Sequence, residues 1–247
     1  MSLIRKKGFY ELYVKRILDI ICSSLVLIVF SWLYLIIALL VRIKLGSPVI
    51  FKQPRPGMID PETGQERIFC LYKFRTMTDE KDETGKLKPD AERLTPFGKK
   101  LRSTSLDELP EVFNILKGDM SIIGPRPQLV RDMVFMTEQQ RMRHTAKPGL
   151  SGLAQVMGRN SISWEEKLDW DLKYIEKISF WSDVKLILMT AKKVFGREES
   201  DESIDLTDDY GDALLKAGKV SKEKYEACQA CANSILTKIS NCKLGMM

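Results

Sequence analysis

Asp107 and Glu108 are two adjacent carboxylates in the stretch RSTSLDELPE, residues 102–111. An ionised, partly desolvated aspartate is a nucleophile towards phosphorus, and a neighbouring glutamate can hold the divalent cation that neutralises a phosphate. A structural alternative is a capping box, since Ser105 is followed three residues later by Glu108 and acidic residues stabilise the first turn of a helix. The surrounding sequence has to decide between these two roles.

Basic residues at the ends of predicted elements are the candidates for binding an anionic substrate. Pro125 and Pro127 fix the backbone on both sides of one arginine in an extended conformation. Arginines brought together in this way can bind a bidentate anion, although each one alone could be a solvated surface residue. The candidates are Lys73, Arg75, Arg102, Arg126 and Arg159.

The elements that must position these side chains follow from local patterns. A short strand running into a Pro-Gly turn is predicted in VIFKQPRPG (49–57), and a second strand in RIFCLYKFRTM (67–77), where Lys73 and Arg75 share one face. A polar loop is predicted over 78–92, then a short basic helix ending near Arg102. The next helix is predicted over LDELPEVFNILKGDMS and stops near Gly118, which places Asp107 in its first turn. Its apolar stripe, predicted to be core, is Leu109, Val112, Phe113 and Leu116.

Charge divides the chain into two parts. Residues 1–197 carry 33 Lys and Arg against 23 Asp and Glu, a net charge of +10, whereas the remaining residues carry 6 against 10, a net charge of −4. A basic body suits nucleic acid, phosphorylated metabolites or an anionic membrane surface. The sequence contains no recognisable nucleic-acid-binding motif, and basic residues alternate with aromatic ones only in short stretches.

An apolar segment near the N-terminus predicts a membrane anchor. Ile20–Val41 runs for 22 residues without a charged side chain, which is long enough to cross a bilayer as a helix. Basic residues flank it on both sides, so the positive-inside rule gives no orientation. A full crossing and a re-entrant hairpin both remain open; in a hairpin, Ser23, Ser24 and Ser31 could hydrogen-bond to the backbone groups that the bend frees.

A second amphipathic segment, WSDVKLILMTAKKVF (181–195), carries an apolar stripe with lysines away from it. The pattern is typical of a helix in the membrane interface, and packing against the protein's own core is the alternative. The stripe consists of Val184, Ile187, Leu188, Ala191, Val194 and Phe195.

The remaining features are predicted to be structural. The five cysteines are expected to be reduced thiols, and Cys228 and Cys231 lack the further ligands of a zinc site. His144, the only histidine, is expected at a helix end or on the surface. Residues 198–212 hold eight acidic residues and no basic one, which predicts a solvated linker, followed by one or two short helices from Ala213.

Several long motifs in order resemble the small monotopic phosphoglycosyl transferases of the bacterial sugar transferase family: KRILDI, YKFRTM, SLDELPEVFNILKGDMSIIGPRP and RHTAKPGLSGLAQVMGRNSISWEEKLDWDLKYI. The resemblance covers about residues 10–196. It implies that a phosphosugar moves from a UDP-sugar to undecaprenyl phosphate with release of UMP. It further implies that Asp107 forms a phosphosugar-aspartyl intermediate, that Glu108 binds Mg²⁺, and that Lys73, Arg102 and Arg159 match basic positions of the family's site. Arg75 and Arg126 are added from local physical arguments.

The resemblance implies a bacterial cytoplasmic membrane protein whose catalytic domain faces the cytoplasm, with UDP-sugar, undecaprenyl phosphate and the lipid bilayer as partners and no nucleic acid. The predicted fold is α+β and helix-dominated: a membrane-anchoring helix (1–45), a catalytic domain (46–197) with interfacial amphipathic helices, and an acidic linker with a short helical tail (198–247). The family usually breaks its membrane helix at a Ser-Pro pair, and here Ser31-Trp32 stands instead, although the resemblance still favours re-entry. The resemblance also implies an N-acetylated amino sugar as the expected donor. The rival functions are a UDP-releasing glycosyltransferase and a non-catalytic, membrane-tethered binder of acidic partners.

Overall fold

The computed structural model describes residues 5–158, 162–195 and 208–244. Helices dominate, together with two two-stranded sheets, which confirms the predicted α+β class. The chain forms two compact units: a smaller unit of Ile17–Gln53 and Cys70–Gly118, and a larger unit of Met1–Arg16, Pro54–Phe69 and Asp119–Met247. The hairpin of β1 (Ile50–Ile59) and β2 (Glu66–Phe74) belongs to both units. The Pro-Gly turn predicted at its start is wrong, because β1 continues through Pro56 and Gly57. The functional division at residues 45 and 197 stays a prediction.

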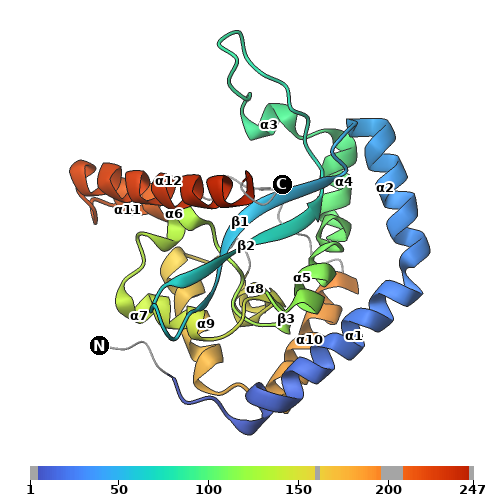
Figure 1. Cartoon of the computed structure of the whole chain (residues 1–247), viewed down its shortest axis with the longest axis vertical. Coiled ribbons are helices and arrows are strands. Elements are labelled where there is room, and N and C mark those ends of the chain that lie inside the picture. The colour runs from blue at the N-terminus through green and yellow to red at the C-terminus, as the bar shows by residue number, and fades with distance from the viewer. Residues whose placement is uncertain (1–4, 159–161, 196–207, 245–247) are drawn as a thin grey trace. The chain divides into compact units, whose positions relative to one another are not determined.

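The smaller unit consists of the N-terminal helices, one end of the β-hairpin and the segment that carries Asp107. Its helices lie beside the strand ends, and α2 runs next to α4 (Figure 1). In chain order its elements are α1 (Lys15–Val29), α2 (Ser31–Leu45), β1 (Ile50–Ile59), β2 (Glu66–Phe74), α3 (Asp90–Arg93), α4 (Pro96–Ser103), a 3-10 turn (Leu106–Glu108) and α5 (Glu111–Lys117).

The predicted apolar helix is broken in the structure. No single helix of the described residues is long and apolar enough to cross a membrane, whereas Tyr10–Val29 and Ser31–Leu45 pass the same test as a pair bent by 66°. The break falls at Phe30, and the Ser31 hydroxyl donates to the Ile28 carbonyl at 3.0 Å. The serine therefore satisfies a backbone group at the bend, as predicted, in a chain that has no proline there.

One face of α2 is buried and the other is exposed. Ile37 and Val41 pack with Phe74 of β2 and Leu101 of α4, and these four residues form the core of the smaller unit. The opposite face, together with most of α1, exposes a continuous series of large apolar side chains: Ile17, Ile20, Ile21, Leu25, Ile28, Val29, Trp32, Leu35, Ile36, Leu39, Leu40 and Ile43. Such an extensive apolar surface is unusual for a protein face in contact with water.

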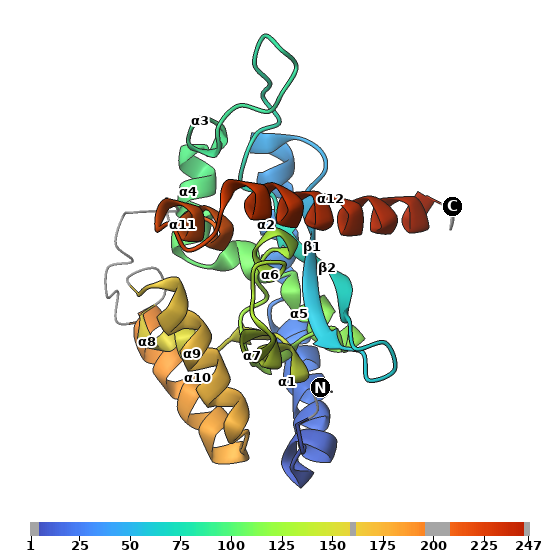
Figure 2. The same cartoon turned by 90° about the vertical axis from the view of Figure 1, so that its left-hand side faces the viewer.

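The larger unit contains a second sheet and most of the helices. Its strands pair in parallel, with Ser121 opposite Gly149 and Ile123 opposite Ser151. The helices α8, α9 and α10 lie side by side (Figure 2). Besides a π-helix at Tyr10–Val14, its elements are β3 (Ser121–Ile123), α6 (Val130–Met133), α7 (Glu138–Arg141), a 3-10 helix (Met142–Thr145), β4 (Gly149–Ser151), α8 (Leu153–Met157), α9 (Trp164–Glu176), α10 (Phe180–Phe195), α11 (Tyr210–Lys216) and α12 (Lys222–Leu244).

The apolar stripe predicted on α10 is exposed at its centre. Leu186 and Met189 pack into the core cluster, whereas Ile187 and Leu188 of the stripe are exposed and Val184 and Ala191 are half-buried. Trp181, in the first turn, is 77% exposed. The alternative that this stripe packs against the protein's own core is therefore wrong for Ile187 and Leu188, whereas the half-buried Val184 and Ala191 leave it open; the side chains of Val194 and Phe195 lie outside the described residues.

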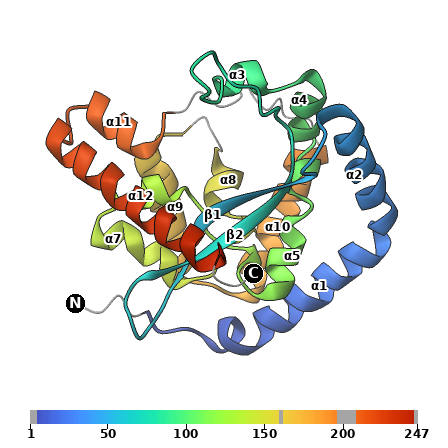
Figure 3. The same ribbon diagram turned by 45° about the horizontal axis from the view of Figure 1, so that its top comes forward.

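The C-terminal helices α11 and α12 are part of the larger unit (Figure 3). Most of the predicted linker, through Thr207, lies outside the described residues. Its last residues do not fit the prediction, because Tyr210 and Gly211 are buried and begin α11. The prediction of one or two short helices from Ala213 is confirmed in part: there are two helices, but α11 begins at Tyr210 and α12, with 23 residues, is not short.

His144 lies in the last turn of the 3-10 helix Met142–Thr145, which confirms the predicted helix end, but it is buried, so the alternative of a surface position is wrong. Its Nδ1 lies 3.0 Å from Glu66 Oε1 and its Nε2 lies 3.0 Å from Arg143. Because a guanidinium can only donate, Nε2 accepts and Nδ1–H donates to Glu66, which fixes a neutral imidazole. Burial, assisted by the charges of Arg143 and Arg141, lowers the His144 pKa to about 4. Burial acts to raise the Glu66 pKa, but the bonds from His144 and Arg141 lower it to about 2.

We expect stability to fall as the pH drops from about 6.5 to about 4, because the unfolded chain binds a proton at His144 in this window and the folded chain does not. The loss is on the order of 3 kcal/mol. Glu66 adds a second loss between about pH 4.5 and 2. Thermal unfolding midpoints of the wild type and of His144→Gln, which retains a donor and an acceptor, test this. The wild type should lose more stability in the upper window; equal losses would contradict the assignment.

Candidate active site

Asp107 lies in a short 3-10 turn, Leu106–Glu108, and is only 7% exposed. Ser105 before it is left-handed, with φ 55°, and its side chain makes no capping hydrogen bond, so the predicted capping box is wrong. The helix proper begins at Glu111, which places Asp107 in front of the first turn of α5 rather than within it. Stabilisation of the Asp107 carboxylate by a helix N-terminus stays a prediction.

A lysine links the acidic residues of this segment to the β-hairpin. Lys73 Nζ lies 2.7 Å from Glu108 Oε1 and 3.2 Å from Glu111 Oε1. Lys73 and Glu108 are largely buried, and Glu111 is almost completely so. Charges at this depth interact more strongly than on an open surface. The structure therefore brings together Lys73 and Glu108, as predicted, and adds Glu111.

Asn114 positions the strand that carries Lys73. It is fully buried, its Oδ1 accepts from the Tyr72 N–H at 3.0 Å, and its Nδ2 donates to the Cys70 carbonyl at 2.6 Å. The side-chain amide thus satisfies the edge of β2 as a neighbouring strand would. The apolar stripe predicted neither Asn114 nor Glu111; the signal for both is a polar side chain within an otherwise apolar helix face.

Arg75 and Arg102 occupy different settings in the smaller unit. The Arg75 guanidinium donates to the Ser47 and Met77 carbonyls, each at 2.8 Å, and pairs with Asp79 at 2.6 Å. These contacts stabilise the turn after β2, and substrate binding by Arg75 stays a prediction.

The predicted basic helix is confirmed as α4, and Arg102 Nε donates to the Thr76 hydroxyl at 3.1 Å near its end. A Cβ at Gly98 would lie 1.9 Å from the Thr76 carbonyl oxygen. Only glycine lets α4 approach the chain after β2 this closely, so Gly98 sets where Arg102 sits.

Arg126 belongs to the larger unit, where three contacts hold its backbone. The carbonyls of three successive residues each accept one hydrogen bond: Pro125 from the Gly149 N–H at 3.0 Å, Arg126 from Arg143 at 2.5 Å, and Pro127 from Arg55 at 2.9 Å. The backbone around Arg126 is therefore held in place, as expected, whereas its extended conformation stays a prediction. Arg159 lies outside the described residues.

The carboxylates fit a magnesium ion that takes most of its ligands from substrate and water. Mg²⁺ is usually bound by one or two carboxylates together with substrate phosphates. Glu108 follows Asp107 directly, whereas the described residues contain no group of three or more His, Cys, Asp or Glu side chains placed to hold a metal ion. Cys228 and Cys231 on α12 are likewise free thiols.

Comparison with known proteins finds a family model described as bacterial sugar transferase, which matches residues 10–197. The uncharacterized sugar transferase EpsL of Bacillus subtilis (strain 168) is 46% identical over 184 residues, which are 74% of this chain and 88% of that protein. The match ends before α11, so the C-terminal helices lie beyond it.

Two relatives have names that specify a donor. The UDP-glucose:undecaprenyl-phosphate glucose-1-phosphate transferase of Klebsiella pneumoniae is 41% identical over 73% of this chain and 40% of that protein. The UDP-N-acetylgalactosamine-undecaprenyl-phosphate N-acetylgalactosaminephosphotransferase of Aeromonas hydrophila is 35% identical over 74% of this chain and 44% of that protein. The chain thus spans less than half the length of these two relatives, and their donor sugars differ.

Proposed function

The chain belongs to the bacterial sugar transferase family, and we propose that it transfers a phosphosugar from a UDP-sugar to undecaprenyl phosphate and releases UMP. The observation that carries this proposal is the placement of the buried Asp107–Glu108 pair, with Lys73, in the same compact unit as the exposed apolar helices α1 and α2. A membrane lipid can reach a carboxylate nucleophile in such a unit. The reaction would be the first membrane-bound step of glycan assembly.

The proposed reaction has two displacements at one phosphorus atom. Asp107 Oδ attacks the phosphorus that carries the sugar, and the bond from this phosphorus to the UMP oxygen breaks, which leaves a phosphosugar on Asp107. An oxygen of undecaprenyl phosphate then attacks the same phosphorus and breaks the bond to Asp107, so the carboxylate is regenerated. This route lets one site serve a soluble donor and a lipid acceptor in turn.

The charged neighbours have separate proposed roles. The Lys73 ammonium, 2.7 Å from Glu108, holds this carboxylate in place beside Asp107 and adds positive charge for the substrate phosphates. Arg102, Arg126 and Arg159 are proposed to bind phosphate oxygens. Glu108 would hold a Mg²⁺ ion, which when bound neutralises charge on the phosphates.

The membrane is the proposed location of the protein. The exposed apolar faces of α1 and α2 suit the hydrocarbon region, and the bend at Phe30 suits entry and return on one side. On α10, exposed Trp181 and Leu188 together with Lys185 and Lys192 suit the interface. We propose the bacterial cytoplasmic membrane, with the catalytic residues on the cytoplasmic side.

The test is nucleotide release by detergent-purified protein supplied with Mg²⁺, undecaprenyl phosphate and a panel of UDP-sugars. We expect UMP with one class of donor, and an N-acetylated amino sugar is our prediction for it. Omitting undecaprenyl phosphate should limit release to about one UMP per enzyme, because the intermediate cannot turn over. Release of UDP would move the protein to the glycosyltransferases, and no release with any donor would favour a non-catalytic binder.

A further inference from the structure

The C-terminal segment beyond the family match, Asp208–Leu236, packs on α6, the helix that follows Arg126 in the chain. The Tyr210 backbone N–H donates to Asp132 Oδ1 at 3.0 Å, and the Asp209 carboxylate pairs with Arg131 at 2.7 Å. Farther along, Ala232 of α12 is fully buried against Val130 and Met133. The segment therefore covers α6 with both polar and apolar contacts.

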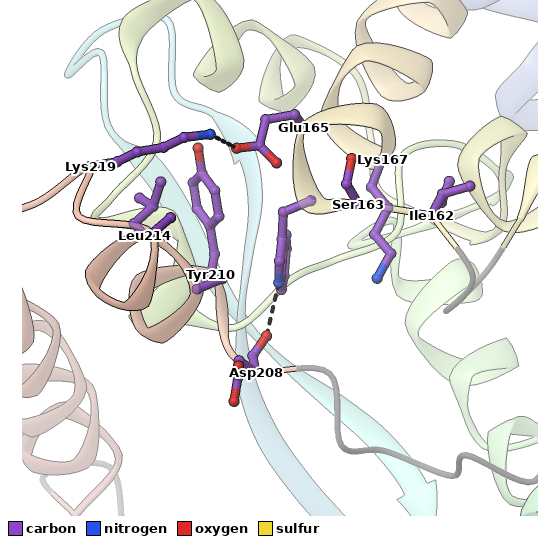
Figure 4. Close-up of a pocket in the computed structure, with 11 residues that line it drawn as sticks. Ile162, Ser163, Glu165, Lys167, Asp208, Tyr210, Leu214 and Lys219 are labelled. Atoms are coloured by element: carbon purple, nitrogen blue, oxygen red, sulfur yellow. Dashed lines mark hydrogen bonds and ion pairs between the residues drawn. The ribbon is translucent and has the colours of Figure 1, made fainter.

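The same segment also holds the start of α9. The ring centroids of Tyr210 and Trp164 are 5.2 Å apart, and the Trp164 indole N–H donates to the Asp208 carbonyl at 2.9 Å. Lys219 pairs with Glu165 at 2.7 Å. Figure 4 shows Tyr210, Leu214 and Lys219 facing α9 across a cavity of about 420 Å³ that residues from both sides line.

The docking is too close to be a loose surface contact. A Cβ at Gly211 would lie 2.4 Å from the Phe135 ring, so a larger residue at this position would displace the ring. Tyr210 is 4% exposed, and its hydroxyl accepts from Gln140 Nε2 at 3.0 Å. One buried tyrosine thus joins α6, α7 and α9.

Two basic residues belong to the segments held in this way: Arg126, which precedes α6, and Lys167 of α9. Lys167 of α9 lines the cavity, and its Nζ lies 5.2 Å from the centre of the Trp164 ring. One turn later, Asp171 binds Arg143, which donates to the Arg126 carbonyl. Burial lowers the Lys167 pKa most, and the positive charge of Arg126 lowers it further. An anion bound between Lys167 and Arg126 would relieve the repulsion between them.

We infer that the C-terminal segment Asp208–Leu236 is a brace that joins α6 to α9 and thereby keeps Arg126 and Lys167 at the spacing that binds an anionic group of the substrate. This inference rests on the proposed function, since it assigns the pair to the phosphates of the UDP-sugar. Tyr210 is the central positioning residue, and Lys167 is a further substrate-binding residue.

The experiment compares full-length wild type, Tyr210→Ala and Tyr210→Phe. The phenylalanine variant keeps the ring against Trp164 and the backbone bond to Asp132, and loses only the hydroxyl bond to Gln140. We expect Tyr210→Ala to raise the KM for the UDP-sugar about tenfold with kcat within about twofold of the wild type, and Tyr210→Phe to stay near the wild-type KM. Hydrogen exchange at the α6 amides, a readout that needs no activity, should be faster in Tyr210→Ala alone.

An unchanged KM in Tyr210→Ala would overturn the inference, and so would a lower kcat with an unchanged KM, because the segment would then only support the fold. If the wild type releases no UMP with any donor, the proposed function fails. In that case the hydrogen-exchange measurement alone tests the brace. Unchanged protection of the α6 amides in Tyr210→Ala would then show that the C-terminal segment does not hold α6.

Discussion

Asp107→Asn is expected to abolish UMP release, by about 10³-fold or more, while the fold stays intact. The amide has the same shape as the carboxylate but is no nucleophile towards phosphorus. Asp107 is buried in the 3-10 turn Leu106–Glu108, so a substitution of equal size avoids a new cavity there. The measurements are the rate of UMP release and the thermal unfolding midpoint.

A chemical readout separates a lost nucleophile from a disturbed site. Wild type incubated with radiolabelled UDP-sugar and no undecaprenyl phosphate should retain label on the protein, and Asp107→Asn should retain none. Asp90→Asn is the matched control, because Asp90 lies in α3 of the same unit with a largely exposed side chain and should keep wild-type activity and labelling. More than about a tenth of wild-type turnover in Asp107→Asn would exclude Asp107 as the nucleophile.

The parts of the smaller unit that the sequence predicted correctly depend on local signals. Period-two alternation locates β2, Thr95 and Pro96 begin α4, and Gly118 ends α5 in the left-handed conformation. Each signal acts within a few residues, so it needs no knowledge of the tertiary contacts.

The predicted start of the Asp107 helix, at Leu106, is wrong because of the proline at position 110. A helix that began at Leu106 would place Pro110 in its interior, where it lacks an N–H and its ring clashes with the Leu106 carbonyl. The chain therefore makes a separate 3-10 turn and starts α5 after the proline. Phe113, predicted to be core, is 43% exposed and meets the Tyr34 ring edge-on at 5.7 Å instead.

Local sequence patterns did not predict the polar contacts between residues far apart in the chain. Asn114 binds the edge of a strand some 42–44 residues earlier, and Asp132 accepts from Tyr210, 78 residues later. Nothing in the local pattern distinguishes these residues from solvated polar residues. The acidic composition around Tyr210 even indicated a solvated linker. Composition is an average over the stretch, so it does not reveal the single aromatic side chain that packs against Trp164.

Arg143→Met is expected to lower the free energy of unfolding by about 3–5 kcal/mol, because it leaves Asp171 as a buried charge without its partner. Arg143 is 1% exposed, and its Nε and Nη2 lie 2.9 and 2.6 Å from Asp171 Oδ2. Burial already raises the Asp171 pKa, with the Arg143 charge opposing it. Removing the guanidinium leaves only the unfavourable effect, and a fall of about 10 °C in the thermal unfolding midpoint should report it.

The double variant Arg143→Met/Asp171→Leu separates the stability of the pair from its role at Arg126. Removing both charges should restore most of the lost stability, since apolar residues often replace a buried ion pair at little cost. The hydrogen bond from Arg143 to the Arg126 carbonyl is missing in both variants. The KM for the UDP-sugar should therefore be raised in the single variant and stay raised in the double variant, although the double variant is stable. Recovery of both quantities would mean that Arg143 only neutralises Asp171. Recovery of stability alone would mean that the guanidinium also holds the backbone of a substrate-binding arginine.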